Sequence, residues 1–217
     1  MKRSLRVLMG LAIGLGAAVG VSRIGLAEDQ KDQAGSAYPK PSPYPVSWEL
    51  TFTHGTPKRV VVEVPGEKQP QAYWYITYTV VNNTGQERMF LPAFTMLTGD
   101  GKLTRSDQNI PPKVFDSIKA REQKRFLEPA WKVSGLLRQG EDQAKDGVAI
   151  WPEPMLRMGE FTIFVSGLSG ETARVKASDG KEQVLFKTLR LTYVVRGDEV
   201  RPGEDEVVEK KSDWVMR

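Results

Sequence analysis

The stretch AYWYITYTVVNNTGQERMFL, residues 72–91, decides the fold predicted for this chain. Large apolar side chains recur at every second position from Trp74 to Val80, and aromatic or β-branched residues with polar tips lie between them. This period of two is typical of a β-strand with one buried and one amphipathic face. The NNTG segment that follows, residues 82–85, favours a tight turn. A strand this long and apolar needs partner strands at its edges and a second layer over its buried face.

Shorter alternating segments on either side of this stretch predict the partner strands. Residues 47–53 and 58–64 alternate in the same way and are separated by a Gly- and Pro-containing segment, which predicts a hairpin. Residues 113–125 break the pattern and predict one amphipathic helix. The remaining segments alternate up to Val195, with turn signals about every 8–12 residues. The chain is therefore predicted to be all-β, a sandwich of about ten strands with one inserted amphipathic helix.

The alternation also predicts which side chains form the core. The expected core residues share one parity on their strands and are all large and apolar. They are Trp48, Leu50, Val60, Val62, Trp74, Ile76, Tyr78, Val80, Phe161, Ile163, Leu191 and Tyr193.

The segment YWYITYTVVNNTGQERMFLPAFTMLTGDGK, residues 73–102, resembles immunoglobulin-like modules of bacterial extracytoplasmic proteins. In those modules an aromatic strand ends in Asn-x-Thr and leads through a Phe or Leu segment to an Asp-Gly turn. The resemblance implies an immunoglobulin-like β-sandwich and an extracytoplasmic setting. It implies no catalytic residues.

The N-terminal residues predict export. Lys2 and Arg3 precede an apolar run at residues 7–21, and Ala27 ends a small-residue pattern that a signal peptidase reads. The run of about 15 residues is shorter than the ~20 that a membrane span needs. We therefore expect cleavage after Ala27, with retention as an anchor as the alternative because Arg23 interrupts the usual pattern. The predicted location is periplasmic or extracellular, without a membrane span after cleavage.

The composition divides the chain into four parts. Residues 1–27 are the predicted signal peptide, and residues 28–45 are a Pro-rich linker that favours an extended conformation. Residues 46–197 are the predicted β-sandwich domain. Residues 198–217 are a charged C-terminal tail whose last apolar residues are expected to dock, either on the sandwich or on a partner.

Charge and cysteine content exclude several classes of function. The chain has 31 Lys and Arg against 27 Asp and Glu, and four of the cations lie in the predicted signal peptide. The rest of the chain is therefore neutral and carries no basic run, so the sequence argues against a nucleic-acid partner. With no cysteine, the protein has neither a disulfide framework nor thiolate chemistry.

Two weak candidate sites for catalysis or metal binding occur in the sequence. His54 is the only histidine, and a hydrolase or metal carrier would have to be built around it. Asp142, Asp146 and Glu153 occupy positions 1, 5 and 12 of a segment that is similar to a calcium-binding loop. Position 3 of that segment is Ala144, which cannot ligate a metal, so a solvated loop between strands is the competing interpretation.

Aromatic side chains supply the candidate binding surface. Aromatic rings on a sheet face or at strand ends can stack on sugars or cover the surface of a partner. The alternative is that both faces of the central strand are covered, one by the second sheet and one by the helix. The candidate binding residues are Tyr73, Tyr75, Trp131, Trp151 and Trp214.

The sequence therefore favours an exported, non-enzymatic β-sandwich protein that acts by protein binding or envelope assembly and uses no cofactor. The expected partner is an envelope or extracellular protein. A carbohydrate- or peptide-binding accessory module, with a glycan as partner, is one alternative. A hydrolase or metal carrier built around His54 is the other.

Overall fold

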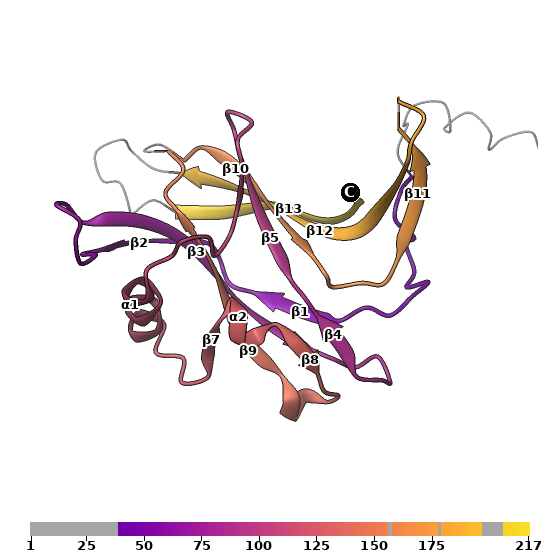
Figure 1. Ribbon diagram of the computed structural model, residues 1–217, viewed down its shortest axis with the longest axis horizontal. Coiled ribbons are helices and arrows are strands. Elements are labelled where there is room, and N and C mark those ends of the chain that lie inside the picture. Colours follow the sequence, from indigo (N-terminus) through magenta and orange to yellow (C-terminus); the bar gives the residue numbers. More distant parts are fainter. Residues whose placement is uncertain (1–38, 156–157, 178, 197–205) are drawn as a thin grey trace, which may run out of the picture. The chain divides into compact units, whose positions relative to one another are not determined.

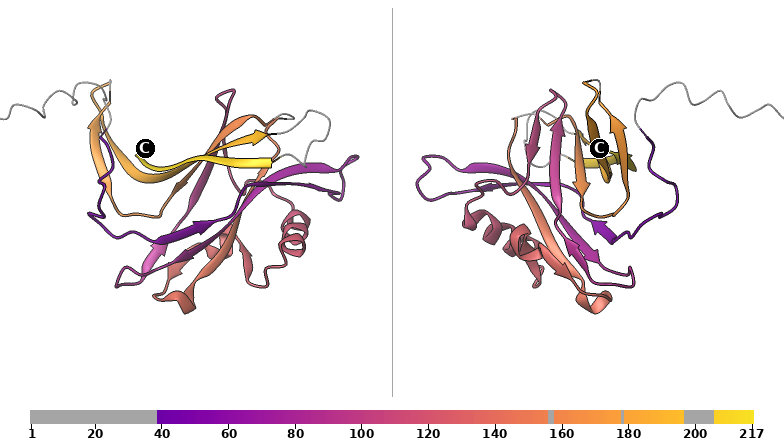
Figure 2. Two further views of the ribbon diagram at one scale, coloured as in Figure 1. Left: turned by 180° about the vertical axis from the view of Figure 1, so that it is seen from behind. Right: turned by 45° about the vertical axis from the view of Figure 1, so that its right-hand side comes forward.

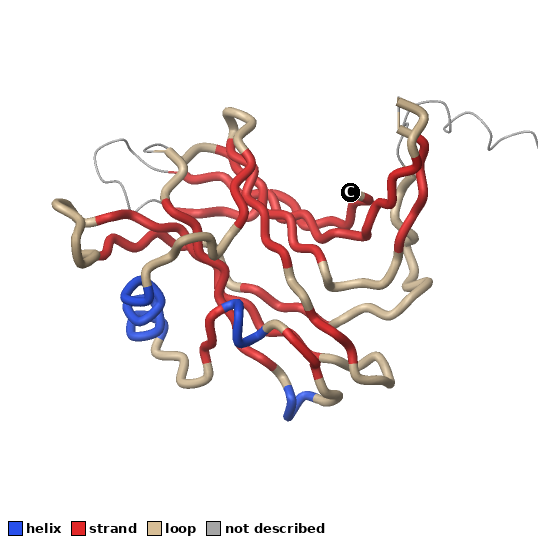
Figure 3. The backbone as a smooth tube through the Cα atoms, in the orientation of Figure 1, coloured by secondary structure: helices blue, strands red, loops and turns tan. Residues whose placement is uncertain are grey.

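A computed structural model describes residues 39–155, 158–177, 179–196 and 206–217. Strands dominate these residues (Figure 3), so the all-β prediction is confirmed. The described residues form thirteen strands rather than about ten, because several of them are only three residues long. The predicted signal peptide lies outside the described residues.

The first sheet is built around the predicted central strand, β3 (Gln71–Val81). One edge of β3 pairs with β9 (Lys145–Pro152), and β9 pairs in turn with the short parallel strand β7 (Leu127–Pro129). The other edge pairs with β1 (Thr51–His54) and with β2 (Lys58–Val62). Both edges of the longest apolar strand are thus occupied (Figure 1).

The second sheet is antiparallel and has β12 as its longest strand. Its described strands run in the order β6, β5, β10, β12, β13, and β11 pairs with the first residues of β12. Their bounds are β5 (Ala93–Thr98), β6 (Leu103–Arg105), β10 (Glu160–Ser166), β11 (Thr172–Lys176), β12 (Glu182–Arg196) and β13 (Glu206–Met216).

Two further strands, β4 (Arg88–Phe90) and β8 (Gly135–Leu137), form a separate ribbon. Helix α2 (Ala130–Val133) leads into β8, and the 3₁₀ helix η1 (Glu141–Gln143) follows it. The sequence pattern predicts one strand over residues 132–137, but these residues span the end of α2 and all of β8.

The predicted hairpin of residues 47–53 and 58–64 is wrong. The two strands do not pair with each other but lie one after the other along the same edge of β3. His54 pairs with Tyr78 and Lys58 pairs with Tyr75, so the edge contains one residue more than β3 does at this point. Such a bulge reverses the side-chain faces, and Val60 therefore faces the opposite side of the sheet from Leu50.

The two faces of the first sheet are covered by different layers (Figure 2). The face that carries Trp74 and Ile76 packs against the second sheet, and the face that carries Tyr73 and Tyr75 packs against helix α1 (Pro112–Glu122). Of the predicted core residues, all except the partly buried Trp48 are buried. Val60 and Val62 belong to the helix side because of the bulge.

Helix α1 confirms the predicted helix, with an end three residues earlier. It begins at Pro112 and ends before Gln123, whose φ of 52° is left-handed and stops the helix. Val114 and Ile118 are buried against the first sheet. Phe126 falls near the same helical period as Val114 and Ile118, but it lies beyond the helix and is exposed.

The segment Gly167-Leu168-Ser169-Gly170 has the residue types of a hairpin turn, but no hairpin forms here. β10 and β11 both pair with β12 along one edge, and this segment bulges out between them. Leu168 is fully buried, and its carbonyl accepts a hydrogen bond of 2.8 Å from the Leu50 amide. The bulge thus connects the second sheet to the strand that opens the first.

Part of the predicted C-terminal tail is a strand of the second sheet. Residues 206–216 form β13, which pairs with β12 along ten residues in two registers separated by a bulge. Trp214 packs against the core between the sheets and Met216 is buried. The apolar chain end therefore docks on its own domain. Local sequence did not indicate this strand because its central residues are mostly charged.

Candidate functional site

Three of the five candidate aromatic residues are buried. Tyr73 and Tyr75 lie under helix α1, and the Tyr75 hydroxyl donates a 2.7 Å hydrogen bond to Glu122 Oε1. Trp151 lies between the sheets, and its indole Nε1–H donates a 3.1 Å hydrogen bond to the carbonyl of Thr104. These rings have no face open to a solvent-borne partner.

The other two aromatic candidates lie apart from these three and from each other. Trp131 is on α2 and is 74% exposed, with the Lys132 ammonium 5.4 Å from the centre of its ring. Trp214 is on β13 and is partly buried beneath Lys187. The five aromatic residues therefore do not form one surface.

The calcium candidates are not brought together. Asp142 lies in η1, whereas Asp146 and Glu153 lie at and just beyond the opposite ends of β9. Asp146 accepts a hydrogen bond from Thr79, and Glu153 pairs with Arg59 through oxygens 2.5 and 3.0 Å from the guanidinium nitrogens. The segment that is similar to a calcium-binding loop is mostly strand, so its acidic residues are spread along the sheet.

His54 lies between the two sheets at the end of β1. Its Nδ1 is 3.1 Å from the Gly55 carbonyl and 3.3 Å from the Tyr193 hydroxyl, and its Nε2 is 3.9 Å from Glu209. Burial and then the charge of Glu209 raise the pKa of Tyr193, so this phenol stays protonated. In the described part of the chain, no group of three or more His, Cys, Asp or Glu side chains is placed to hold a metal.

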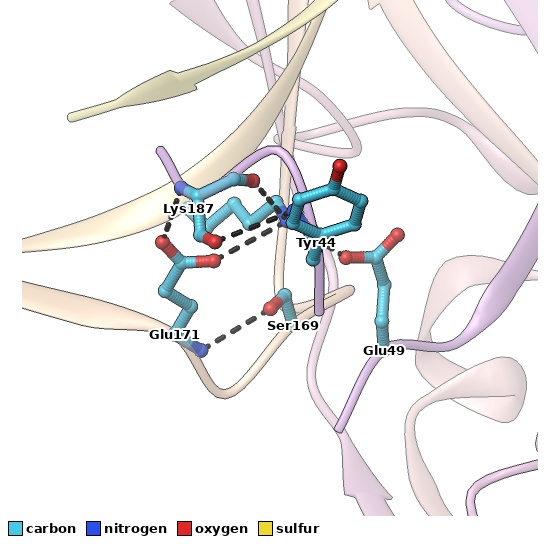
Figure 4. Close-up of polar contacts among 6 residues, drawn as sticks. Tyr44, Glu49, Ser169, Glu171 and Lys187 are labelled. Atoms are coloured by element: carbon cyan, nitrogen blue, oxygen red, sulfur yellow. Dashed lines mark hydrogen bonds and ion pairs between the residues drawn. The ribbon is translucent and has the colours of Figure 1, made fainter. Parts of the chain in front are cut away.

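A buried lysine forms the densest cluster of charges that the sequence analysis missed (Figure 4). Lys187, on β12, is 3% exposed. Its Nζ lies 2.9 Å from Glu49 Oε2 and 3.3 Å from Glu171 Oε2. The ammonium also lies 5.0 Å from the centre of the Trp214 ring. The sequence does contain one sign of this cluster. Lys187 lies on the same side of β12 as Leu185 and Leu189, which are buried.

This lysine cluster fixes the end of the Pro-rich segment to the domain. The Ser42 amide donates a 2.7 Å hydrogen bond to Glu171 Oε1, and Lys187 Nζ donates a 3.5 Å hydrogen bond to the Ser42 carbonyl. Glu171 is itself held by its amide, which donates to Ser169 Oγ at 3.1 Å. The lysine cluster therefore joins the linker, the lead-in to β1, the bulge and β12.

The charges around Lys187 favour a structural role for this lysine and not a role as a catalytic amine. Burial lowers the pKa of Lys187, but the hydrogen bonds to Glu49 and Glu171 outweigh it and the net shift is upward. A reactive lysine needs a lowered pKa, because only the neutral amine is nucleophilic. Lys187 is therefore locked in its charged form, and its chemistry here is structural.

Asp107 is an exposed residue beyond the end of β6, and its carboxyl group lies against the backbone of Ile150. Its amide donates a 2.8 Å hydrogen bond to the Ile150 carbonyl, and its Oδ1 accepts a 3.3 Å hydrogen bond from the Ile150 amide. Ser106 Oγ donates to its other oxygen at 2.5 Å. Partial removal of its carboxyl group from water raises the pKa of Asp107 to about 6, although these hydrogen bonds lower it in part. The folded protein therefore keeps this proton up to a higher pH than the unfolded chain does.

This shift predicts a pH-dependent stability that depends on Asp107. Between pH 4 and 6 the folded state binds more protons than the unfolded state, so the free energy of unfolding falls as the pH rises. We expect Asp107→Asn to remove this loss in urea unfolding measured across the range. Asp116→Asn, on an exposed face of α1, is the control, and equal pH profiles for Asp107→Asn and the parent would contradict the prediction.

The ribbon of β4 and β8 carries an exposed apolar face. Phe90 and Leu137 point into the core between the sheets, whereas Met89 and Leu136 lie opposite each other in register and are 58% and 52% exposed. Leu91, two residues beyond Met89, is also exposed. We call Met89, Leu91 and Leu136 the ribbon face. Scattered apolar residues are ordinary on protein surfaces, but adjacent ones on a strand pair are characteristic of interaction surfaces.

The sequence did not indicate the ribbon face as a site. The alternation of residues 88–91 predicted a strand, but the partner of β4 is β8, which is about fifty positions away. Comparison with protein-family models, curated proteins and solved structures gives no match. No helix in the described ranges is long and apolar enough to cross a bilayer.

Proposed function

We propose that this chain is an exported, non-enzymatic β-sandwich protein. It binds another protein of the periplasm or the extracellular space and acts in envelope assembly. The ribbon face is the observation that carries the proposal. Met89, Leu91 and Leu136 form a small aliphatic surface that water does not solvate well. A partner protein with a complementary aliphatic surface would cover it and gain the free energy of burial.

The surroundings of the ribbon face support a protein partner. Protein interfaces usually have an apolar centre and a polar rim. Lys132 on α2 and Arg138 after β8 are exposed cations on either side of β8 in the chain. They fit a partner whose aliphatic patch is bordered by acidic side chains. The exposed Trp131, on the helix before β8, adds an aromatic side chain of the type that often anchors interfaces.

A paired substitution tests the proposal. The variant Met89→Ser/Leu136→Ser should lose the partner that the parent protein retains from the envelope fraction of its own host. Each lost apolar contact costs about 1–2 kcal/mol, so the affinity for that partner should fall roughly tenfold or more. The variant should unfold at nearly the same temperature as the parent, because both side chains are exposed.

The matched control is Val61→Ser/Val184→Ser, which removes two exposed aliphatic side chains elsewhere on the domain. This control should retain the partner. Equal loss in both variants, or retention in both, would contradict a role for the ribbon face. A retained glycan in place of a protein would favour the carbohydrate-binding alternative.

Three finer points of this proposal rest on the sequence. Export and cleavage after Ala27 rest on the N-terminal pattern, which lies outside the described residues. The immunoglobulin-like connectivity of the sandwich rests on the resemblance of residues 73–102. The non-enzymatic assignment rests on the solitary His54, whose ring contacts a buried phenol and a carboxylate.

A further inference from the structure

The outer face of the second sheet is hollowed beside Arg217. Thr95 on β5 and Phe164 on β10 lie on this face, because their strand neighbours Phe94 and Val165 point into the core. The hollow has a volume of about 200 Å³. Its polar and aromatic lining comprises Thr95, Phe164, Ser166, Phe186, Thr188 and Arg217.

Arg217 is held in place over this hollow. Its backbone exchanges two hydrogen bonds with Phe186, of 2.7 and 3.1 Å, which continue the pairing of β12 and β13. Its guanidinium carbon lies 4.1 Å from the centre of the Phe164 ring. This cation–π contact fixes the planar guanidinium against the wall of the hollow.

The guanidinium has no anionic partner among the described residues. No Asp or Glu oxygen of the described ranges lies within 4 Å of it. The neighbouring Arg190, in contrast, is paired with Asp213 at 2.6 Å. Partial removal from water lowers the pKa of Arg217, and no carboxylate offsets this effect. An uncompensated guanidinium beside a hollow favours an acidic ligand group.

The rest of the lining favours a sugar ring over a peptide. One common mode of peptide binding adds a strand to a free sheet edge, and β10 offers no such edge here because it is paired with both β5 and β12. The lining instead offers three hydroxyls. Those of Ser166 and Thr188 donate to the carbonyls of Ala93 and Phe186, at 3.3 and 3.0 Å, and can accept from a ligand hydroxyl, whereas that of Thr95 can also donate. Phe186 is 52% exposed and presents a ring on which a sugar can stack.

We propose that this hollow binds an acidic sugar residue, with Arg217 on the acid group, Phe186 against the ring and the three hydroxyls on the sugar hydroxyls. The site is independent of the ribbon face because it uses other residues. Guanidinium forks bind carboxylates and sulfates alike, so both sources of the acid group are tested.

The test measures amide chemical shifts of the protein during titration with monosaccharides. Galacturonic acid and galactose 6-sulfate are the two acidic probes. Their neutral counterparts are the methyl ester of galacturonic acid and galactose. Either acid should shift the amides of Thr95, Phe164 and Phe186, with affinity at least roughly tenfold above that for its neutral counterpart. The stronger of the two acids identifies the acid group.

Matched variants complete the test. Arg217→Gln should weaken binding of the acid roughly tenfold, whereas Arg138→Gln, an exposed arginine after β8, should not change it. Met89→Ser/Leu136→Ser should also bind the sugar normally, which separates this proposal from the protein-binding one. Absence of shifts with both acids, equal shifts with galactose, or undiminished binding by folded Arg217→Gln would overturn the proposal.

Discussion

Lys187→Met is expected to lower the free energy of unfolding by about 3–5 kcal/mol, the usual cost of removing one partner from a buried ion pair. The substitution keeps most of the side-chain volume but removes the cation that lies 2.9 and 3.3 Å from two carboxylates. Glu49 and Glu171 would then face each other in a site that the protein shields from water. Urea unfolding of the variant and the parent at neutral pH measures the difference.

A triple variant separates the loss of charge balance from the loss of packing. Lys187→Met/Glu49→Gln/Glu171→Gln removes the cation and both anions, and replacing a whole buried charge cluster by neutral groups is often close to neutral in stability. We expect it to recover most of the lost free energy. If Lys187→Met alone lowered the free energy of unfolding by less than about 0.5 kcal/mol, the range for surface substitutions, the lysine cluster would not stabilise the fold.

Ile76→Ala is expected to cost about 2–5 kcal/mol, the range for large-to-small changes in a packed core. Ile76 is fully buried in the middle of β3, on the face that meets the second sheet. The cavity would lie among packed side chains of both sheets, which can relax into it only in part. Thermal and urea unfolding measure the change.

Two further substitutions calibrate this result. Ile76→Val removes one methyl group and should cost about 0.5–1.5 kcal/mol. Thr51→Ala, at an exposed position of β1, should stay within about 0.5 kcal/mol of the parent. If Ile76→Ala behaved like Thr51→Ala, the assignment of the two faces of β3 would be wrong.

The local pattern of the sequence predicted the parts of the fold that depend on local chemistry. Alternation along β3 identified Trp74, Ile76 and Tyr78 as core, and the two predicted layers over its faces are present. The helical period at Val114 and Ile118 identified α1. These features follow from side-chain spacing within one element, which a sequence displays directly.

Features that depend on pairing between distant segments were not predictable in this way. The bulge after His54 becomes visible only through the register of β1 and β2 against β3. The charged strand β13 is stabilised by its pairing with β12 and not by its own composition. Exposure of Met89 likewise depends on what covers β4, which its own sequence does not specify.

The candidate binding residues were predicted wrongly for a related reason. Tyr73, Tyr75 and Trp151 have the residue types of a binding surface, but helix α1 and the second sheet cover them. The lysine cluster and the hollow beside Arg217 each combine residues from at least three separate segments. Of these residues, only Lys187 could have been noticed in the sequence, because it is a charged residue at a position of β12 where the alternation calls for an apolar one.

The central claim is that the ribbon face binds a protein partner, and site-specific photo-crosslinking tests it most directly. A photoreactive phenylalanine analogue is placed at Leu136, or at the exposed Val184 as a control, and the protein is irradiated in its own host. The account predicts a discrete adduct with another protein from position 136 and none from position 184. No adduct from position 136, or the same adducts from both positions, would contradict it.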